Sequence, residues 1–246
     1  DDGPILVAYR YSKDRSGQTP AQVLGGSTGV LLVDGYTGYN AVTSVDGRTR
    51  AACLAHVRRK FFDAKGAASD RALELILDVY RVEHDALERG IVRTAEHAEL
   101  RRTKGRAAMN AFHRWLVEQE PHHGPASGIG KAVRHALKNW DRLCVFLDDV
   151  NVPIDNNFSE ASLRPIAKGR DNWMYAGTHE AAENIAALLT LTATCEANGI
   201  NPELYLADVL ERLPTHPQSE LDDLLPHNWR RLYLAAAEAK AEDAAA

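Results

Sequence analysis

Two short segments of this chain place acidic side chains where they could hold a divalent cation. Asp34 follows the apolar run 30–33 and precedes Gly35, so it lies where a buried strand of an α/β sheet would end. Glu160 lies in the first turn of an expected helix that also carries Arg164. Two carboxylates around Mg²⁺, with an arginine to clamp a phosphate, suit phosphodiester chemistry. The first hypothesis is therefore a metal-assisted nucleotidyl-transfer site.

Each segment also has a purely structural interpretation. Asp34 and Gly35 together are typical of a turn that terminates a strand. Asn157 as N-cap and Glu160 three residues later form a capping-box-like arrangement. Glu160 and Arg164 are spaced as an ordinary i,i+4 ion pair on one helix face. From the residues alone, both interpretations stay open.

Basic side chains gather in two places that could contact a nucleic-acid backbone. The first is a run directly after the segment 53–56, and the second lies just beyond Glu160, beside a tryptophan that could stack on a base. The predicted DNA-contacting residues are Arg58, Arg59, Lys60, Asn157, Arg164, Lys168, Arg170 and Trp173. A solvated basic turn beside a core tryptophan is the alternative for the second cluster.

Composition narrows the class of protein. The formal net charge is −5, so a DNA-binding surface would have to concentrate its cations locally. Three widely spaced cysteines, Cys53, Cys144 and Cys195, favour a reducing compartment over a disulfide framework. Cys53 and His56 have a CxxH spacing, but no second pair stands at zinc-finger distance. No apolar run is long enough for a membrane span, and no phosphate-binding glycine loop or nucleophile elbow is present.

Hydrophobic periodicity predicts an α/β part followed by a larger helical part. We expect strands over 5–11, 29–33 and 50–54, the second of them covered on both faces. The expected helices cover 20–24, 55–64, a segment from residue 70, 94–120, 127–147, 155–163, 185–195, 202–213 and 229–241.

Taken together, these segments resemble the transposases of the insertion-sequence-66 group of bacterial mobile elements. The matching motifs run in order along the chain, which makes the combination far more specific than any one of them. They are Tyr9-Arg10-Tyr11-Ser12, Asp34-Gly35-Tyr36-Thr37-Gly38-Tyr39-Asn40, Cys53-Leu54-Ala55-His56-Val57-Arg58-Arg59-Lys60-Phe61-Phe62, Ile154-Asp155-Asn156-Asn157 with Glu160, Leu163-Arg164-Pro165, Gly169-Arg170, Asn172-Trp173, Asn198-Gly199-Ile200-Asn201-Pro202 and Asp223-Leu224-Leu225-Pro226.

The resemblance implies an α/β, RNase-H-like core with an Asp-Asp-Glu triad, a large all-helical insertion and a helical C-terminal region. Asp34 falls at the second Asp and Glu160 at the Glu, so both are expected to be catalytic and to hold metal, two Mg²⁺ or Mn²⁺ ions per complete site. The expected parts are an α/β portion over 1–66, the insertion over 67–150, the catalytic Glu helix and its flanking helices over 151–213, and an extension over 214–246.

The resemblance also implies the partners: the terminal inverted repeats of the element, target DNA and further copies of the protein, in the bacterial cytoplasm and without a membrane. In the family the first Asp lies before the point where this chain begins, so we expect the isolated chain to bind DNA weakly without cutting it. Two other interpretations stay open. One is a non-catalytic helical module for DNA binding or assembly, and the other is a nuclease of the same fold.

Overall fold

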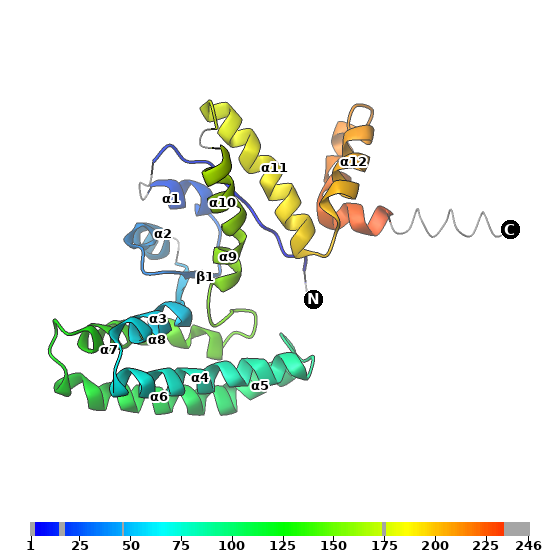
Figure 1. Ribbon diagram of the computed structural model, residues 1–246. Coiled ribbons are helices and arrows are strands. Elements are labelled where there is room, and N and C mark those ends of the chain that lie inside the picture. The colour runs from blue at the N-terminus through cyan, green and yellow to red at the C-terminus, as the bar shows by residue number, and fades with distance from the viewer. Residues whose placement is uncertain (1–2, 15–17, 46, 174–175, 234–246) are drawn as a thin grey trace. The chain divides into compact units, whose positions relative to one another are not determined.

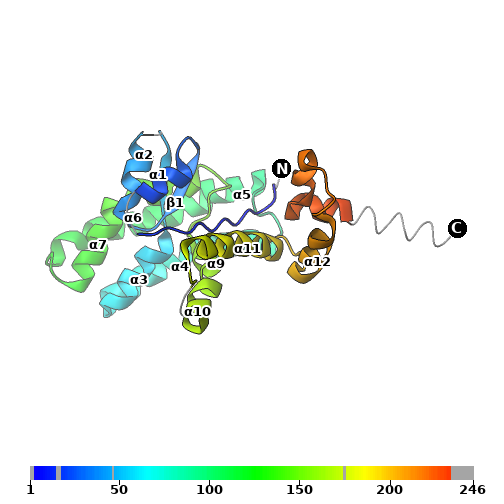
Figure 2. The same cartoon turned by 90° about the horizontal axis from the view of Figure 1, so that it is seen from above.

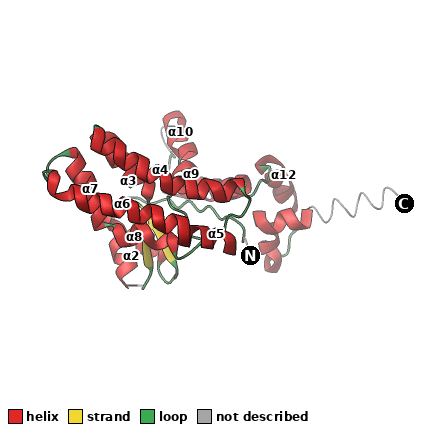
Figure 3. Ribbon diagram, turned by 90° about the horizontal axis from the view of Figure 1, so that it is seen from below, coloured by secondary structure: helices red, strands yellow, loops and turns green. Residues whose placement is uncertain are grey.

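The computed structural model describes residues 3–14, 18–45, 47–173 and 176–233 (Figure 1). The chain folds as two compact units: a terminal unit, Asp1–Asp14 with Ser162–Ala246, and a central unit, Arg15–Ala161. Helices make up most of the described residues, and the strands are few (Figure 3). None of the helices in these ranges is both long and apolar enough to cross a membrane.

The central unit contains a small two-stranded parallel sheet. Strand β1 (Val30–Val33) pairs with β2 (Thr49–Ala52) in the register Val30 to Thr49 and Val33 to Ala52. Helix α1 (Gln18–Leu24) precedes β1, and η1 (Thr37–Tyr39) with α2 (Asn40–Val45) connects the two strands. Strand β1 is less covered than predicted: Val30 is 37% exposed, and of its four residues Val33 alone is buried.

A helical bundle packs against this sheet and supplies most of the core. Helices α4 (Ala67–Glu88) and α6 (Arg106–Gln119) run side by side along its length, with α3 (Leu54–Ala64) and α7 (Gly128–Lys138) packed over them (Figure 1). Shorter elements are α5 (Ala95–Leu100), η2 (Arg101–Gly105), η3 (Glu120–His122), α8 (Trp140–Cys144), η4 (Val145–Leu147) and α9 (Asn157–Ser162). The core side chains with almost no exposure include Phe61, Ile76, Val79, Met109, Phe112, Leu116 and Val133.

The helix predicted over 94–120 is interrupted at η2, a π-helical turn that begins at Arg101. Such turns widen the helix and often mark functional or strained positions. Here the turn holds Arg101 at 2% exposure, and its guanidinium donates to backbone carbonyls of residues 146–152 and to the Glu83 carboxylate. The bundle is thereby tied to the loop that leads to the Glu160 helix.

The terminal unit is built on α10 (Arg164–Trp173), α11 (His179–Ala197), α12 (Pro202–Arg212) and η5 (Gln218–Leu224). Gly199 has φ +65° two residues after the end of α11, a backbone conformation that suits glycine at a helix end. Asn201 caps α12, because its side-chain oxygen accepts from the N–H groups of Glu203 and Leu204. The unit's small core consists of Cys195, Ile200, Tyr205, Val209, Leu224 and Trp229.

The segment 5–11, predicted as a strand, is extended but joins no sheet in the described part of the chain. It runs along α11 (Figure 2), where Thr190, Thr194 and Asn198 exchange hydrogen bonds with the backbone of alternate residues, Tyr9, Val7 and Ile5. Four helical residues rise about 6.0 Å and two extended residues about 6.6 Å, so the two repeats match. The side chains of the helix therefore take the place of a neighbouring strand.

Candidate functional site

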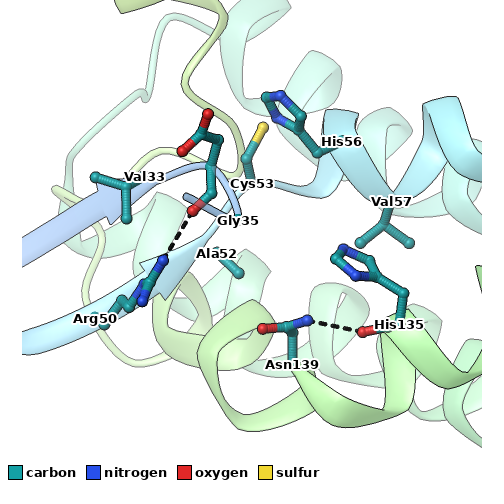
Figure 4. Close-up of a pocket in the computed structure, with 10 residues that line it drawn as sticks. Val33, Gly35, Arg50, Ala52, Cys53, His56, Val57, His135 and Asn139 are labelled. Carbon is teal, nitrogen blue, oxygen red and sulfur yellow. Dashed lines mark hydrogen bonds between the residues drawn. The ribbon is translucent and has the colours of Figure 1, made fainter. Parts of the chain in front are cut away.

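A small pocket opens where β1 and β2 end, and it brings together residues from the sheet and the bundle. Its volume of about 20 Å³ is enough for one water molecule or one ion. Arg50 lies on its sheet side, and His56 and His135 lie on its helix side (Figure 4). The lining residues are Val33, Asp34, Gly35, Arg50, Ala52, Cys53, His56, Val57, His135 and Asn139. The carboxyl ends of parallel strands are the usual place for functional groups in such sheets.

Asp34 lines this pocket in a half-buried position, held by a turn of its own. Its Oδ1 accepts from the backbone N–H of Tyr36 at 3.0 Å, the turn geometry that its sequence context also allowed. The Arg50 guanidinium donates to the carbonyl oxygens of Asp34 at 3.0 Å and of Tyr36 at 3.1 Å. Arg50, which the sequence did not single out, therefore fixes the backbone on which the Asp34 carboxylate stands.

The segment that precedes Glu160 is anchored to the first residues of α3. The N–H of Leu54 donates to the carbonyl of Ile154 at 3.0 Å, and the N–H of Asn156 donates to Cys53 Sγ at 3.5 Å. These two bonds place the start of α9 beside the residue that follows β2. The CxxH segment thus has a structural role as well as a place in the pocket.

Asp155, rather than Asn157, supplies the side chain that caps α9. Its carboxylate accepts from the backbone N–H of Asn157 at 3.1 Å and from the Asn157 side-chain amide at 2.9 Å. It also accepts from the Tyr80 hydroxyl at 2.8 Å. Burial and the nearby Asp155 carboxylate raise the pKa of Tyr80, so the hydroxyl remains a donor. The prediction that Asn157 is the N-cap is wrong, because Asn157 is the first residue of the helix.

Glu160 is connected to the pocket of Asp34 by a contact with His56. His56 Nε2 lies 3.3 Å from Glu160 Oε1, with the two side chains 37% and 48% exposed. Because His56 also lines the pocket of Asp34, one imidazole links the surroundings of both predicted catalytic carboxylates. His56 is not among the residues predicted from the sequence for the site, although it lines the pocket and contacts Glu160. Its CxxH spacing was the available signal.

The predicted basic residues are divided between the two units. Arg58, Arg59 and Lys60 are exposed on α3, and Arg59 lies 4.0 Å from Asp63 on the same helix. Arg164 and Lys168 are exposed on α10. A turn at Leu163 separates α9 from α10, so Glu160 and Arg164 do not share one helix face as predicted. The side chains of Arg170 and Trp173 lie outside the described residues.

His135 carries the strongest electrostatic perturbation in the pocket. Burial and the positive charges of Lys60, His56 and Lys138 lower its pKa to about 4 from 6.5. Each of these positive charges opposes protonation of the ring.

The His135 pKa predicts how stability depends on pH. Because its pKa is lower in the folded protein, the unfolded chain binds the proton more tightly, and His135's stabilising contribution is complete above pH 6.5. That contribution, about 1–3 kcal/mol, should decrease as the pH falls from 6.5 towards 4. Urea unfolding across this range should show the decrease in the natural chain and a smaller one in His135→Gln. If the free energy of unfolding of the natural chain and of His135→Gln depended equally on pH, His135 would not be the cause of the decrease. The exposed His84→Gln is the control.

A separate group of possible metal donors lies in the terminal unit. His216, Glu220 and Asp223 place their donor atoms within 4.8 Å of one another, and in the described residues they form the one such group of three. His216 Nε2 already lies 2.9 Å from the backbone carbonyl of Glu220. Within the part of the chain that the structure describes, the predicted metal residues Asp34 and Glu160 therefore do not form a compact trio with a third donor.

Comparison with known families shows the family to which the chain belongs. The profile of the Transposase IS66 family matches residues 1–184, and that of the IS66 C-terminal element matches residues 190–227. The chain therefore belongs to the IS66 transposase family, and the resemblance found in its motifs is confirmed.

The relatives found are proteins of Sinorhizobium fredii (strain NBRC 101917 / NGR234). The chain is 34% identical to the uncharacterized protein y4hP over 93% of its own length and 44% of that protein. It is 33% identical to the uncharacterized protein y4jD over 92% of its length and 46% of that protein. The chain thus spans less than half the length of the curated relatives it matches. No solved structure matches it.

Proposed function

We propose that this chain carries the second and third carboxylates of a DDE-type DNA transposase, Asp34 and Glu160. The observation that supports this most directly is their common connection to His56, which lines the pocket of Asp34 and contacts Glu160. These carboxylates come from segments 126 residues apart in the chain, since 160 − 34 = 126. A turn and a cap alone would give no reason for both segments to meet at one histidine.

The donor set fits Mg²⁺ or Mn²⁺, two ions in a complete site. Both carboxylates are half-buried or exposed, and the pocket beside Asp34 has room for one ion or water. Bound divalent ions would activate a nucleophile and stabilise the leaving oxygen of a phosphodiester. In this chain, Asp34 and Glu160 would hold the ions, and the hydrogen bonds of Arg50 and Asp155 would orient the segments that carry them.

The substrate in this proposal is DNA, namely the ends of the mobile element and the target duplex. The exposed cations of α3, Arg58, Arg59 and Lys60, together with Arg164 and Lys168 of α10, would contact phosphates. Among the described residues, Arg58 and Lys60 have no acidic partner within ion-pair distance, which leaves them available to phosphate oxygens. Assembly of several copies on DNA, and a place in the cytoplasm, are part of the same proposal.

The test is metal-dependent cleavage and joining of labelled duplexes that carry the element's terminal repeats. We expect the longer protein, which includes the upstream coding sequence, to cut these ends with Mg²⁺ or Mn²⁺. The present chain should bind the same duplexes without cutting them. Specific binding without cleavage by the longer protein would instead favour the non-catalytic DNA-binding module. Cleavage by the present chain would show that Asp34 and Glu160 suffice.

A further inference from the structure

We propose that His56 is a metal-contacting residue and that His56 and Glu160 form one half of the divalent-cation site, with a preference for Mn²⁺ over Mg²⁺. This inference rests on the proposed function and adds a nitrogen donor to a site otherwise made of carboxylates. Mg²⁺ is bound almost entirely by oxygen ligands, whereas Mn²⁺ accepts an imidazole more readily. The histidine therefore determines which metal the site binds best.

The distance between the two donor atoms fits a shared ion. Imidazole nitrogen and carboxylate oxygen bind first-row divalent metals at about 2.1 Å, which separates two such ligands by about 3.0 Å at a right angle and about 3.4 Å at the tetrahedral angle. His56 Nε2 and Glu160 Oε1 lie 3.3 Å apart. An ion could therefore bind between them with little movement of either side chain.

The His56 ring is not held in a structural hydrogen-bond network. Its Nδ1 is buried and has no hydrogen-bond partner among the described residues, so Glu160 is the polar group that Nε2 faces. A histidine with a purely structural role usually has its buried nitrogens paired. A water or a ligand that reaches the ring would supply the missing partner.

Asp34 belongs to the other half of the site in this arrangement. It lines the pocket together with His56, yet Asp34, His56 and Glu160 do not gather their donor atoms within 4.8 Å. In a site with two ions about 3.5–4 Å apart, each ion has its own ligands, so the donor atoms of all three residues need not lie together. One ion would then lie at Asp34 and the other between His56 and Glu160.

The chain contains a matched control pair for this proposal. His84 Nε2 lies 3.2 Å from Glu88 Oε1 on α4, the same atoms at nearly the same distance. The His84 and Glu88 side chains are 66% and 68% exposed and lie one helical turn apart, whereas His56 and Glu160 come from distant segments. A metal effect that depended only on a neighbouring His and Glu would be equal for the two pairs.

The experiment is Mn²⁺ titration of the 246-residue chain, with free Mn²⁺ measured by electron paramagnetic resonance and Mg²⁺ as competitor. We expect a site in the natural chain, a dissociation constant at least about tenfold higher in His56→Ala, and a smaller effect of this substitution on Mg²⁺. His84→Ala should leave Mn²⁺ binding unchanged. Nuclear magnetic resonance should show Mn²⁺ broadening the His56 ring signals before those of His84. Circular dichroism should show that the variants remain folded. His56→Asn is a second, more conservative variant that should weaken Mn²⁺ binding as well.

The outcomes separate this inference from the proposed function. If Glu160→Gln weakens Mn²⁺ binding while His56→Ala does not, His56 is not a ligand and the carboxylate site stands. If neither substitution changes Mn²⁺ binding, or the natural chain binds no Mn²⁺, the half-site does not exist. DNA cleavage by the longer protein tests the proposed function in either case.

Discussion

Asp34→Asn and Glu160→Gln should each lower the rate of metal-dependent DNA cleavage by roughly a thousandfold or more in the protein that includes the upstream sequence. Each substitution replaces a carboxylate that is proposed to bind metal by a neutral amide. A bound metal contributes several kcal/mol to stabilising the charge that develops in the transition state, and each 1.36 kcal/mol corresponds to a factor of ten in rate. The measurement is single-turnover cleavage of a terminal-repeat duplex at saturating protein.

The loss should come from chemistry, because both substitutions preserve the local structure. An amide oxygen at position 34 can still accept from the Tyr36 N–H, so the turn that places residue 34 is retained. The contact between Glu160 and His56 is about half exposed and contributes at most about 1 kcal/mol to stability. Thermal unfolding of both variants should therefore stay close to that of the natural chain.

Two exposed carboxylates serve as controls for the removal of one negative charge. Asp63→Asn on α3 and Glu118→Gln on α6 change the net charge equally at positions outside the pocket. They should leave the cleavage rate within about threefold of normal, since exposed charges at a distance are largely screened. Retention of the rate in Asp34→Asn or Glu160→Gln would exclude that residue as a metal ligand.

The location of Asp34 could be predicted because it depends on local rules. A continuous apolar run of strand length followed by Asp-Gly defines both the strand end and the turn, and β1 ends at Val33 as expected. The helix boundaries at Ala64, Gly199 and Pro202 follow from similar local signals. The family is confirmed, whereas the catalytic roles of Asp34 and Glu160 and the RNase-H-like core stay predictions.

The errors arise where tertiary partners decide between two locally equal choices. Residues 5–11 have strand-like composition, but the partners of their backbone are Thr190, Thr194 and Asn198 on a helix far away in sequence. Asn157 and Asp155 are both suitable caps, and the Tyr80 hydroxyl adds a partner to Asp155 alone. No local pattern reveals either preference.

Arg101 is the clearest example of a residue that the sequence analysis could not identify, because its importance lies entirely in long-range contacts. Its guanidinium donates to Glu83 at 2.6 and 2.8 Å and lies 5.3 Å from the ring centre of Phe146. It also donates to four carbonyl oxygens, those of Phe146, Asp149, Val150 and Val152, at 2.9–3.3 Å. This single side chain therefore ties the segment 146–152 to the helical bundle.

Arg101→Leu should lower the free energy of unfolding by about 3–5 kcal/mol, because it removes the arginine partner of the largely buried Glu83 carboxylate and the side-chain donor shared by four carbonyl groups. The measurement is urea unfolding followed by circular dichroism. Arg102→Leu removes an exposed arginine that pairs with Glu99 one turn away, and it should cost less than about 1 kcal/mol. If Arg101→Leu and Arg102→Leu lowered the free energy of unfolding equally, the contacts of Arg101 would have no special stabilising role.

The loop that Arg101 holds leads directly to the predicted catalytic helix. The loss of the Arg101 side chain should therefore also affect the local stability of that helix. Val152 lies two residues before Ile154, whose carbonyl accepts from Leu54, and Asp155 then caps the helix of Glu160. Hydrogen exchange at the amides of α9 should therefore become faster in Arg101→Leu, while the start of α4 stays protected.

A double variant separates the effect of the unpaired Glu83 charge from the effect of the lost hydrogen bonds between Arg101 and the loop carbonyls. Adding Glu83→Met to Arg101→Leu removes the unpaired buried carboxylate, and replacement of a buried ion pair by apolar residues is often neutral. Stability should therefore recover in part, but the four carbonyls still lack the hydrogen bonds from Arg101, so exchange in α9 should remain fast. Full recovery of protection would mean that Arg101 stabilises the bundle without positioning the segment that carries Glu160.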